Sequence, residues 1–511
     1  MSGQSDGPTT RYDRLFRTDE LRRNLKRLTV RGGTVAVANH AAKVVLLVGS
    51  TMILARLLRP EDFGLVAMVT AITGFSNTFR DFGLSSATIQ REDVRHDQVS
   101  RLFWVNLGIS AVLAVIIAAA SPAIAWFYGQ PLLVGVTLAL ATSSLLDGLS
   151  IQHGAMIRRQ MRFGALAALD LTATAAGAAV ALLLAWYGAG YWALVAQQLV
   201  SLGTRTALMW LVSGWRPGAA APLSEVRSML AFGGNLTGSR TINYCARNLD
   251  KVLIGKFWSA EQLGFYSKAL NAIVQPFQQA TQMLGRVAIP TLSRLQDDPS
   301  RYRTYLTTAV LMVATAGLPA VAFLAVDAEN LVRLLLGRQW LQTVPFLRIL
   351  IPAAILEMVT MATRWIFISL GQTSKLLRWR VLESAVKTVA LAAGVRWGPM
   401  GIAIGVGASS AVLIVPAVLY GIRGSPLRVR DLAATVWRPL TAALAGAAGL
   451  AVLHSLRPAA WSPAAALAVD APAFVAVYLG AWWLLPGGRA ALLGLARLAA
   501  ELRPAPRGQR A

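Results

Sequence analysis

A succession of long apolar stretches runs through the whole chain, and the short segments between them alternate between rich and poor in Lys and Arg. Several stretches approach the ~20 residues that a helix needs to cross the hydrocarbon core of a bilayer. Hydrophobic residues make up 55% of the 511 positions, and stretches such as 102–126 and 440–453 exceed what a soluble core requires. The pattern predicts an all-α integral membrane protein with about 14 transmembrane helices.

The distribution of Lys and Arg predicts how the chain is oriented. With the N-terminus in the cytoplasm, the cytoplasmic segments carry several times as many basic residues as the opposite side. Basic residues keep loops in the cytoplasm during insertion, so both termini are expected there. The same bias explains most of the net charge of +25 without nucleic-acid binding. The denser basic segment 11–31 repeats Leu at helical spacing, which suits a helix lying on anionic lipid.

Residue types needed for metal, redox or ATP chemistry are scarce. Cys245 is the only cysteine, so neither an intramolecular disulfide nor a CxxC motif is possible. The four histidines, at 40, 96, 153 and 454, are far apart in the sequence, and no Walker A lysine motif is present. We therefore expect no metal site, no cofactor and no ATP hydrolysis.

The chain resembles itself at an offset of 200 residues. Glu61 corresponds to Glu261, and the segment 63–65 (Phe-Gly-Leu) corresponds to 263–265 (Leu-Gly-Phe). An even number of helices per repeat places both halves the same way up, and in such transporters the substrate site lies between the halves. We therefore expect two six-helix lobes related by a pseudo-two-fold repeat, plus two C-terminal helices.

These features predict the division of the chain. It comprises a cytoplasmic basic N-terminal segment (1–31), an N-lobe (32–213), a cytoplasmic linker (214–229), a C-lobe (230–421), two additional transmembrane helices (422–488) and a cytoplasmic basic tail (489–511). Within the N-lobe, 63–89 and 102–128 are each expected to form one span. The last two helices are expected to serve packing or lipid contact.

Charged residues within the apolar stretches indicate a polar interior. A charge at the centre of a transmembrane helix costs roughly 2.5–3.5 kcal/mol on insertion scales, so such residues usually face a wet cavity. The basic residues there outnumber the acidic ones: Lys43, Arg80, Arg205, Arg240, Arg247, Lys251, Lys268, Arg286, Arg348, Arg364 and Lys387 against Asp81, Asp147, Asp170, Asp250, Glu357 and Glu383. A cationic interior suits an anionic head group such as a lipid diphosphate, which Arg binds bidentately and Lys as a point charge.

The densest polar face lies in the stretch 230–257. Four side chains share one helical face at steps of four, three and four, with two more beside them: Arg240, Tyr244, Arg247 and Lys251, flanked by Asn243 and Asp250. The next stretch continues with polar side chains at similar steps: Gln275, Gln278, Gln282 and Arg286. In the first half, His40 and Lys43 occupy the positions 200 before Arg240 and Asn243. These are candidate cavity residues; an internal ion-pair network and contacts between helices are the alternatives.

A second group of residues fits either ion coupling or structural ion pairs: Arg80, Asp81, Asp250, Glu357 and Arg364. Because Arg80 and Asp81 are adjacent, they point about 100° apart around a helix and are expected to have separate partners. Asp147, Asp170 and Glu383 are proton-carrier candidates on the same grounds. By contrast, Asp327 and Glu329 are expected at a solvated helix end.

Two pairs of motifs carry a resemblance to a known family. The segments 55–64 (ARLLRPEDFG) and 80–84 (RDFGL), and then 248–251 (NLDK) and 263–266 (LGFY), resemble those of bacterial polysaccharide-export flippases. These are the Wzx-like, WzxC-type members of the multidrug/oligosaccharidyl-lipid/polysaccharide transporter superfamily. The resemblance covers roughly residues 30–420.

The resemblance implies a V-shaped bundle of two six-helix lobes with two extra helices, in the bacterial inner membrane. It implies translocation of an undecaprenyl-diphosphate-linked oligosaccharide from the cytoplasmic to the periplasmic leaflet by alternating access, for exopolysaccharide, capsule or O-antigen (lipopolysaccharide) biosynthesis. The implied partners are this lipid-linked substrate, membrane lipids, a glycan polymerase and export machinery. Arg240, Arg247 and Lys251 are the candidates for contacting the diphosphate or anionic sugars.

Two other functions stay open at this point. A multidrug or cation antiporter of the same superfamily is expected to have an acidic cavity, whereas this interior has a basic excess. A glycan polymerase or lipid-dependent glycosyltransferase commonly places its chemistry in a large periplasmic loop, and the longest here, near 327–340, is short. The sequence therefore favours a transporter over an enzyme.

Overall fold

The computed structural model describes residues 25–81, 84–90, 94–219, 221–222, 244, 248–456 and 461–501, some of them by their backbone alone. This part of the chain is helical and contains no strand. It divides into two compact units, residues 1–264 and 265–511. The boundary falls inside helix α13 (Ala260–Arg294), so the segment 248–264 belongs to the first unit.

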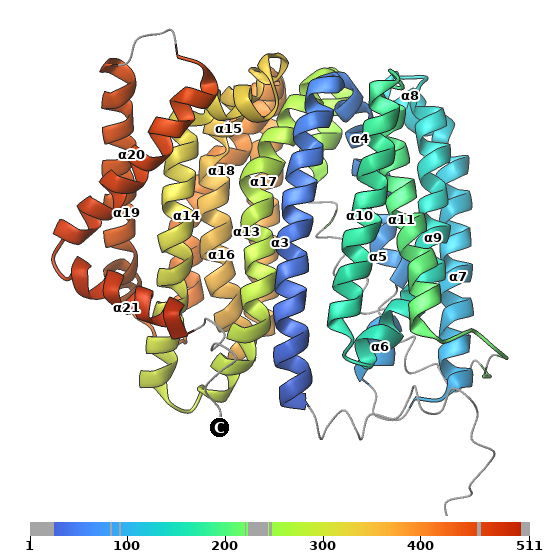
Figure 1. Cartoon of the computed structure of the whole chain (residues 1–511), viewed down its shortest axis with the longest axis horizontal. Coiled ribbons are helices and arrows are strands. Elements are labelled where there is room, and N and C mark those ends of the chain that lie inside the picture. Colours follow the sequence, from blue (N-terminus) through green and yellow to red (C-terminus); the bar gives the residue numbers. More distant parts are fainter. Residues whose placement is uncertain are drawn as a thin grey trace, which may run out of the picture. The chain divides into compact units, whose positions relative to one another are not determined.

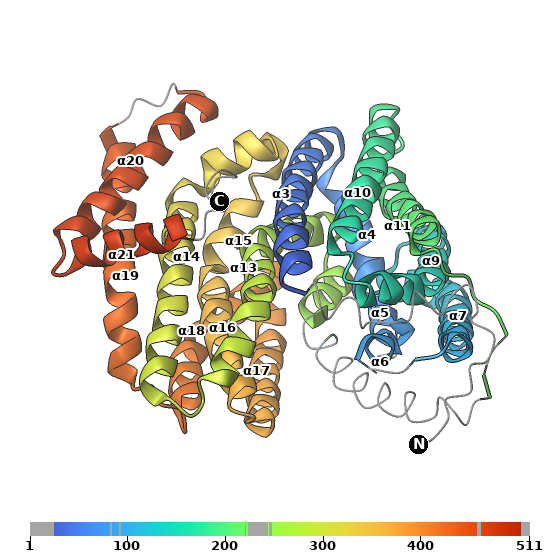
Figure 2. The same cartoon turned by 60° about the horizontal axis from the view of Figure 1, so that its bottom comes forward.

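The first unit is built from helices that pack in a row (Figures 1 and 2). They are α3 (Leu25–Leu57), α4 (Pro60–Thr73), α5 (Ser76–Asp81), α6 (Leu84–Gln90), α7 (His96–Ala119), α8 (Ser121–Tyr128), α9 (Leu133–Arg159), α10 (Phe163–Trp186) and α11 (Tyr191–Ser213). In the row, α3 packs on α10, α10 on α11, α11 on α9 and α9 on α7, while α4, α5 and α6 pack against α9.

Two predicted spans of this unit are each broken into shorter helices. The span 63–89 divides because α4 ends at Thr73 with Gly74 as its C-cap, and α5 and α6 follow. The span 102–128 divides because α7 ends at Ala119 and α8 begins anew with a proline in its first turn. Proline has no backbone N–H to continue the preceding helix but is favoured in a first turn.

The second unit contains the rest of α13 and further helices. They are α14 (Pro299–Leu335), η1 (Arg338–Trp340), α15 (Thr343–Ile349), α16 (Ile351–Ser369), α17 (Thr373–Gly394), η2 (Val395–Trp397), α18 (Gly398–Ile422), α19 (Val429–Leu456), α20 (Pro463–Leu484) and α21 (Gly488–Glu501). Helix α18 packs against α16 and α17, and the last long pair, α19 and α20, packs on α14 (Figure 1). Ala442, Ala443 and Phe474 are buried in this second contact.

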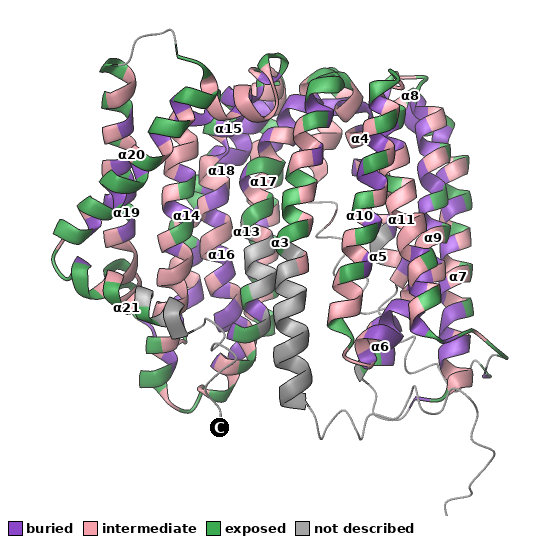
Figure 3. Cartoon of the chain, in the orientation of Figure 1, coloured by how far each residue is buried: buried purple, intermediate pink, exposed green. Residues whose placement is uncertain are grey.

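The outer surfaces of the helices are apolar, as a lipid environment requires. Val115 on α7 is 68% exposed, and Val45, Val389 and Val412 are also exposed. Exposed positions run along helices such as α7 and α10 (Figure 3). Eight helical segments among the described residues are long and apolar enough to cross a membrane. The chain is therefore an all-α, multi-pass membrane protein; the total of about 14 spans stays a prediction.

The 200-residue offset predicted from the sequence is visible in the local structure. The first helix of each repeat ends at position 57 or 257, and the next helix begins at position 60 or 260. In the first unit these two helix starts lie against each other: a Cβ added at Gly64 would overlap the carbonyl oxygen of Ala260, and one added at Gly264 would overlap that of Pro60. The contacts are reciprocal, as a two-fold relation between the repeats requires.

One sequence-based expectation about the second unit is wrong. Asp327 does not lie at a solvated helix end: it is 1% exposed and sits at a kink inside α14, with non-helical φ/ψ of −99° and 18°. The helix continues past the kink to Leu335, and Asn330 donates a hydrogen bond to Asp327 (2.7 Å). Only Glu329, two residues on, is exposed, and it pairs with Arg333 (2.6 Å).

Candidate functional site

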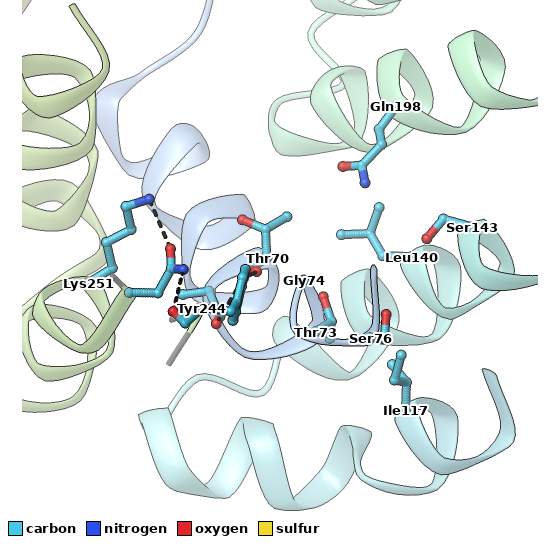
Figure 4. A pocket seen from close by; sticks show the side chains of 12 residues that line it. Thr70, Thr73, Gly74, Ser76, Ile117, Leu140, Ser143, Gln198, Tyr244 and Lys251 are labelled. Carbon is cyan, nitrogen blue, oxygen red and sulfur yellow. Dashed lines mark hydrogen bonds between the residues drawn. The ribbon is translucent and has the colours of Figure 1, made fainter. Parts of the chain in front are cut away.

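Two polar cavities adjoin each other within the first unit. The first encloses about 280 Å³ and the second about 450 Å³, and Ser143 and Gln198 line both. The first is lined by α4, α5, α7, α9 and α11 together with Tyr244, Asn248 and Lys251 (Figure 4). The second extends to α3 and α10. Together they form a polar region among helices whose outer faces are apolar.

Hydroxyl groups dominate one wall of the first cavity. The Thr70 and Thr73 hydroxyls, at the end of α4, donate hydrogen bonds to the carbonyls of Val66 and Val69 (2.9 Å each). These backbone bonds satisfy the hydroxyl protons and leave oxygen lone pairs to accept from a bound molecule. Ser76 and Ser143 add hydroxyls to the same lining.

The opposite wall is held in place by a chain of hydrogen bonds. The Tyr244 hydroxyl donates to the carbonyl of Thr70 (2.8 Å), and the Asn248 amide donates to the carbonyl of Tyr244 (3.0 Å). Lys251 Nζ then donates to Asn248 Oδ1 (3.2 Å). In Figure 4, Lys251 and Tyr244 reach in from one side, and Gln198 and Ser143 lie across from them. The lysine thus has a fixed position at the cavity wall.

Two arginine–carboxylate pairs line the second cavity. Arg80 lies 2.5 Å from Asp147 and donates to the carbonyl of Ser143 (3.1 Å). Arg205 lies 2.8 Å from Asp170. Each carboxylate in this cavity is therefore neutralised by an arginine.

The two cavities together carry an excess of positive charge. Lys43, Arg80, Arg205 and Lys251 line them, against the carboxylates of Asp147 and Asp170 only. Among the described residues, no carboxylate lies within ion-pair distance of Lys43 or Lys251, and both carboxylates of the lining are already paired. An anion in these cavities could therefore bind Lys43 and Lys251 without breaking an ion pair between a lysine and a carboxylate.

The structure places seven of the sequence-predicted residues on these cavities. Two line the first, Tyr244 and Lys251, and five line the second: Lys43, Arg80, Asp147, Asp170 and Arg205. Three others, Arg240, Asn243 and Arg247, lie outside the described residues, and so do the side chains of His40, Gln282 and Arg286. Their assignment to the cavity stays a prediction.

Other candidates are not among the residues that line the two cavities. Gln275 and Gln278 are on the part of α13 that belongs to the second unit, where Gln275 is exposed and donates to Asn271 (3.3 Å). Asp81 accepts hydrogen bonds from the Ser85 amide and hydroxyl, so Arg80 and Asp81 have separate partners, as their spacing predicted.

The remaining three candidates for coupling or ion pairing, Asp250, Glu357 and Arg364, have structural contacts. Asp250 is buried and accepts from the Lys251 amide (2.8 Å). On α16 in the second unit, Arg364 lies 3.8 Å from Glu357. The contact between Arg364 and Glu357 is an ion pair. A coupling role for any of these three residues stays a prediction.

The sequence analysis missed several lining residues that carry no charge. Thr70, Thr73, Ser143, Gln198 and Asn248 are all in the cavity walls. A signal was available for one wall, because Gln198, Ser201 and Arg205 recur at helical steps within an otherwise apolar stretch. Single serines and threonines give no such signal, since they satisfy their hydroxyls on their own helix.

The sequence of this chain is similar to those of proteins involved in polysaccharide biosynthesis. Residues 53–345 match the family described as "Polysaccharide biosynthesis protein". The lipopolysaccharide biosynthesis protein WzxC of Escherichia coli (strain K12) is 26% identical over 343 residues, which cover 65% of this chain and 69% of WzxC. The match confirms the resemblance that the motifs at 55–64 and 248–251 indicated.

Two solved structures share the fold. The lipid II flippase MurJ in an inward closed conformation superposes with a TM-score of 0.71 over 90% of this chain and 99% of that one, at 11% identity. An inward-facing multidrug resistance MATE family transporter of the MOP superfamily superposes with a TM-score of 0.60. The match covers 76% of this chain and 97% of the transporter, at 14% identity. At these identities the likeness concerns the fold.

Proposed function

This chain belongs to the polysaccharide biosynthesis protein family, and from that premise we propose that it is a flippase for undecaprenyl-diphosphate-linked oligosaccharide. It moves this substrate from the cytoplasmic to the periplasmic leaflet by alternating access, and it is a transporter, not an enzyme. Its relative WzxC is named for lipopolysaccharide biosynthesis, and MurJ, which shares its fold, is named a lipid II flippase. Both names support a lipid-linked glycan as the substrate class.

The observation that carries the proposal is the excess positive charge of the two cavities. A diphosphate brings several negative charges into a region of low dielectric, and its passage requires compensating cations. Lys43 and Lys251 line the cavities without a carboxylate partner among the described residues, so they are available for this role. The sequence adds Arg240 and Arg247 on the same predicted helical face as Lys251.

The uncharged lining suits the sugar part of the substrate. Sugar hydroxyls both donate and accept hydrogen bonds, and the lining offers threonine and serine oxygens and the amide of Gln198. The second cavity, of about 450 Å³, has the size of a small-molecule site, about 300–1,000 Å³, and the first, of about 280 Å³, is slightly smaller. In this assignment the cationic residues hold the diphosphate and the hydroxyl-rich wall holds the first sugars.

The cellular setting forms part of the proposal. The protein is multi-pass, and we place it in the bacterial inner membrane with both termini in the cytoplasm, because of the Lys and Arg distribution. The two lobes, 32–213 and 230–421, supply the two halves of the alternating-access cycle. A glycan polymerase and export machinery act on the product in the periplasm.

A multidrug or cation antiporter is the competing function, favoured only by the shared fold with the MATE transporter. A cation substrate requires carboxylates that can face it. Both carboxylates of the cavity lining are paired with arginines, and the lysines are the groups left over. The charge of the lining therefore supports the flippase.

The test compares lysine variants in a strain that lacks the chromosomal gene. We expect Lys43→Ala and Lys251→Ala each to lower surface glycan severalfold, and the double variant to lower it at least tenfold, with lipid-linked oligosaccharide accumulating on the cytoplasmic face. Membrane insertion should be unchanged, as measured by the amount of full-length protein in the membrane fraction. Lys251→Arg, which keeps the charge, should retain most of the export.

The matched control is Lys375→Ala. Lys375 is half-buried, lies at the start of α17 and donates to the carbonyl of Arg423 (3.0 Å), and it lines neither cavity. Its variant should export normally. Normal export by the Lys43/Lys251 double variant, or cation efflux that the double variant retains, would contradict the proposed function.

A further inference from the structure

Three side chains of ligand type meet in the second unit, far from each other in the sequence. Asp327 comes from the kink in α14, His454 from the last turn of α19, and Asp470 from the second turn of α20. One ligand atom from each lies within 4.8 Å of the other two. Helices α14, α19 and α20 pack together, so the cluster lies where three helices meet (Figure 1).

The distances between the three groups fit the coordination of one small cation. His454 Nε2 lies 3.0 Å from Asp470 Oδ2 and 3.7 Å from Asp327 Oδ1. Zinc binds imidazole nitrogen and carboxylate oxygen at ~2.0–2.2 Å, which gives tetrahedral edges of about 3.3–3.6 Å between ligand atoms. The two observed separations bracket this range. The same imidazole nitrogen faces both carboxylates, as a shared cation requires.

The burial of the two carboxylates also fits a bound cation. Both aspartate side chains are fully buried, and the helices that carry them are apolar enough to span a membrane. Charged groups within such helices are rare and usually take part in a specific interaction. His454, with 28% of its side chain exposed, provides a route by which a cation can enter.

We propose that Asp327, His454 and Asp470 bind one divalent transition-metal cation, which fastens the C-terminal helix pair α19–α20 to the kink of α14. The nitrogen ligand selects zinc-like cations over Mg²⁺ and Ca²⁺, which prefer oxygen ligands. Asn330, through its hydrogen bond to Asp327 Oδ1, orients one of the ligands from the outer shell. The sequence analysis expected no metal site because the chain has one cysteine and its four histidines form no ligand-spaced pair; His454 and the two aspartates are also far apart in the sequence.

The test uses the full-length protein, purified in detergent, treated with a chelator and then titrated with Zn²⁺. We expect one Zn²⁺ to be retained per chain after desalting, measured by elemental mass spectrometry, together with a higher thermal unfolding midpoint. The variants Asp327→Asn, His454→Gln and Asp470→Asn should each weaken Zn²⁺ binding by on the order of tenfold or more. Mg²⁺ at the same concentration should leave the midpoint unchanged.

The matched control is Glu329→Gln, two residues from Asp327 on α14. Glu329 is exposed and paired with Arg333, so its variant should bind Zn²⁺ like the parent protein. Should a cluster variant fail to fold, the visible spectrum of Co²⁺ bound to the parent protein reports nitrogen and oxygen ligation directly. Absence of stoichiometric Zn²⁺ in the parent protein overturns the proposal, as does an equal response to Mg²⁺ or an equal loss in Glu329→Gln.

Discussion

The cavities of the first unit and the Asp327–His454–Asp470 cluster of the second unit are both polar regions within apolar helices, but different groups line them. In the cavities both carboxylates are paired with arginines, and Lys43 and Lys251 remain. In the cluster two carboxylates share one imidazole. The two proposals therefore assign a ligand from the type of group that lines a buried region, lysines for an anion and carboxylates with an imidazole for a cation, and not from the number of charged residues.

The largest expected effect tests the pairing within the cavities. Asp147→Asn removes the carboxylate from Arg80, whose side chain is 8% exposed. Breaking a buried ion pair from one side costs about 3 kcal/mol or more, because the remaining charge stays buried. We expect a clearly lower thermal unfolding midpoint of the purified protein in detergent.

Asp170→Asn provides the comparison for this variant. Asp170 and Arg205 are about equally exposed, at 30% and 28%, so water can solvate the remaining arginine. Its cost should be about 1 kcal/mol. Equal unfolding midpoints for the two variants would mean that Arg80 is solvated without Asp147. The Arg80–Asp147 ion pair would then not be needed to neutralise a buried charge in the first unit.

A smaller effect is expected from a change that leaves every charge in place. In Gly74→Ala the new Cβ overlaps the Tyr244 hydroxyl, which Gly74 lets approach the end of α4. Overpacking of this kind typically costs about 1–3 kcal/mol. We expect roughly tenfold weaker binding of undecaprenyl diphosphate to the purified protein, measured by native mass spectrometry.

Two variants control for this substitution. Gly108→Ala on α7 adds a methyl group with no neighbouring atom within 4 Å and should bind normally. Tyr244→Phe in the Gly74→Ala background removes the overlapping oxygen and should recover part of the binding. If Gly74→Ala binds undecaprenyl diphosphate like the parent protein, the hydrogen bonds from Tyr244 to Lys251 are not what positions the cavity lining. The cavities would then differ from the Asp327–His454–Asp470 cluster only in the charged groups that line them.

The smallest effect is expected at an ion pair outside both regions. Glu357 and Arg364 on α16 are 3.8 Å apart, beyond hydrogen-bond length. Glu357→Gln should therefore change stability by less than about 1 kcal/mol. It should also leave glycan export unchanged in the complementation assay. Loss of export at normal stability would instead identify Glu357 as a coupling residue and would give the second unit a direct part in transport.

The sequence predicted the helices better than it predicted their interruptions. Apolar length and the 200-residue offset indicated where helices lie, and the equivalent helix starts at Pro60 and Ala260 confirm that offset. The break at Gly74 was missed because a single glycine within a predicted span is tolerated in a helix and does not by itself indicate a helix end. Pro122 could have predicted the start of α8, because proline is favoured in the first turn of a helix, but the sequence analysis did not use it.

The candidate site was predictable where it carries charge. Lys43, Arg80 and Lys251 stand out because a charge in an apolar stretch is costly and therefore rare. Which carboxylate pairs with Arg80 was not predictable, because Asp147 lies on another helix and only the packing of α5 on α9 brings them together. The same reason hid the cluster around His454, whose ligands come from three helices.

The reciprocal contacts of Gly64 and Gly264 have a consequence for how the two repeats can evolve. The absence of a side chain at each glycine leaves space for a carbonyl oxygen of the other repeat. A larger side chain at Gly64 or Gly264 would therefore overlap backbone atoms of the other repeat. Backbone atoms cannot be exchanged for smaller ones by mutation, and no substitution at Ala260 or Pro60 restores the lost space. A side chain larger than that of glycine can therefore be accepted at either position only if the two helix starts move apart.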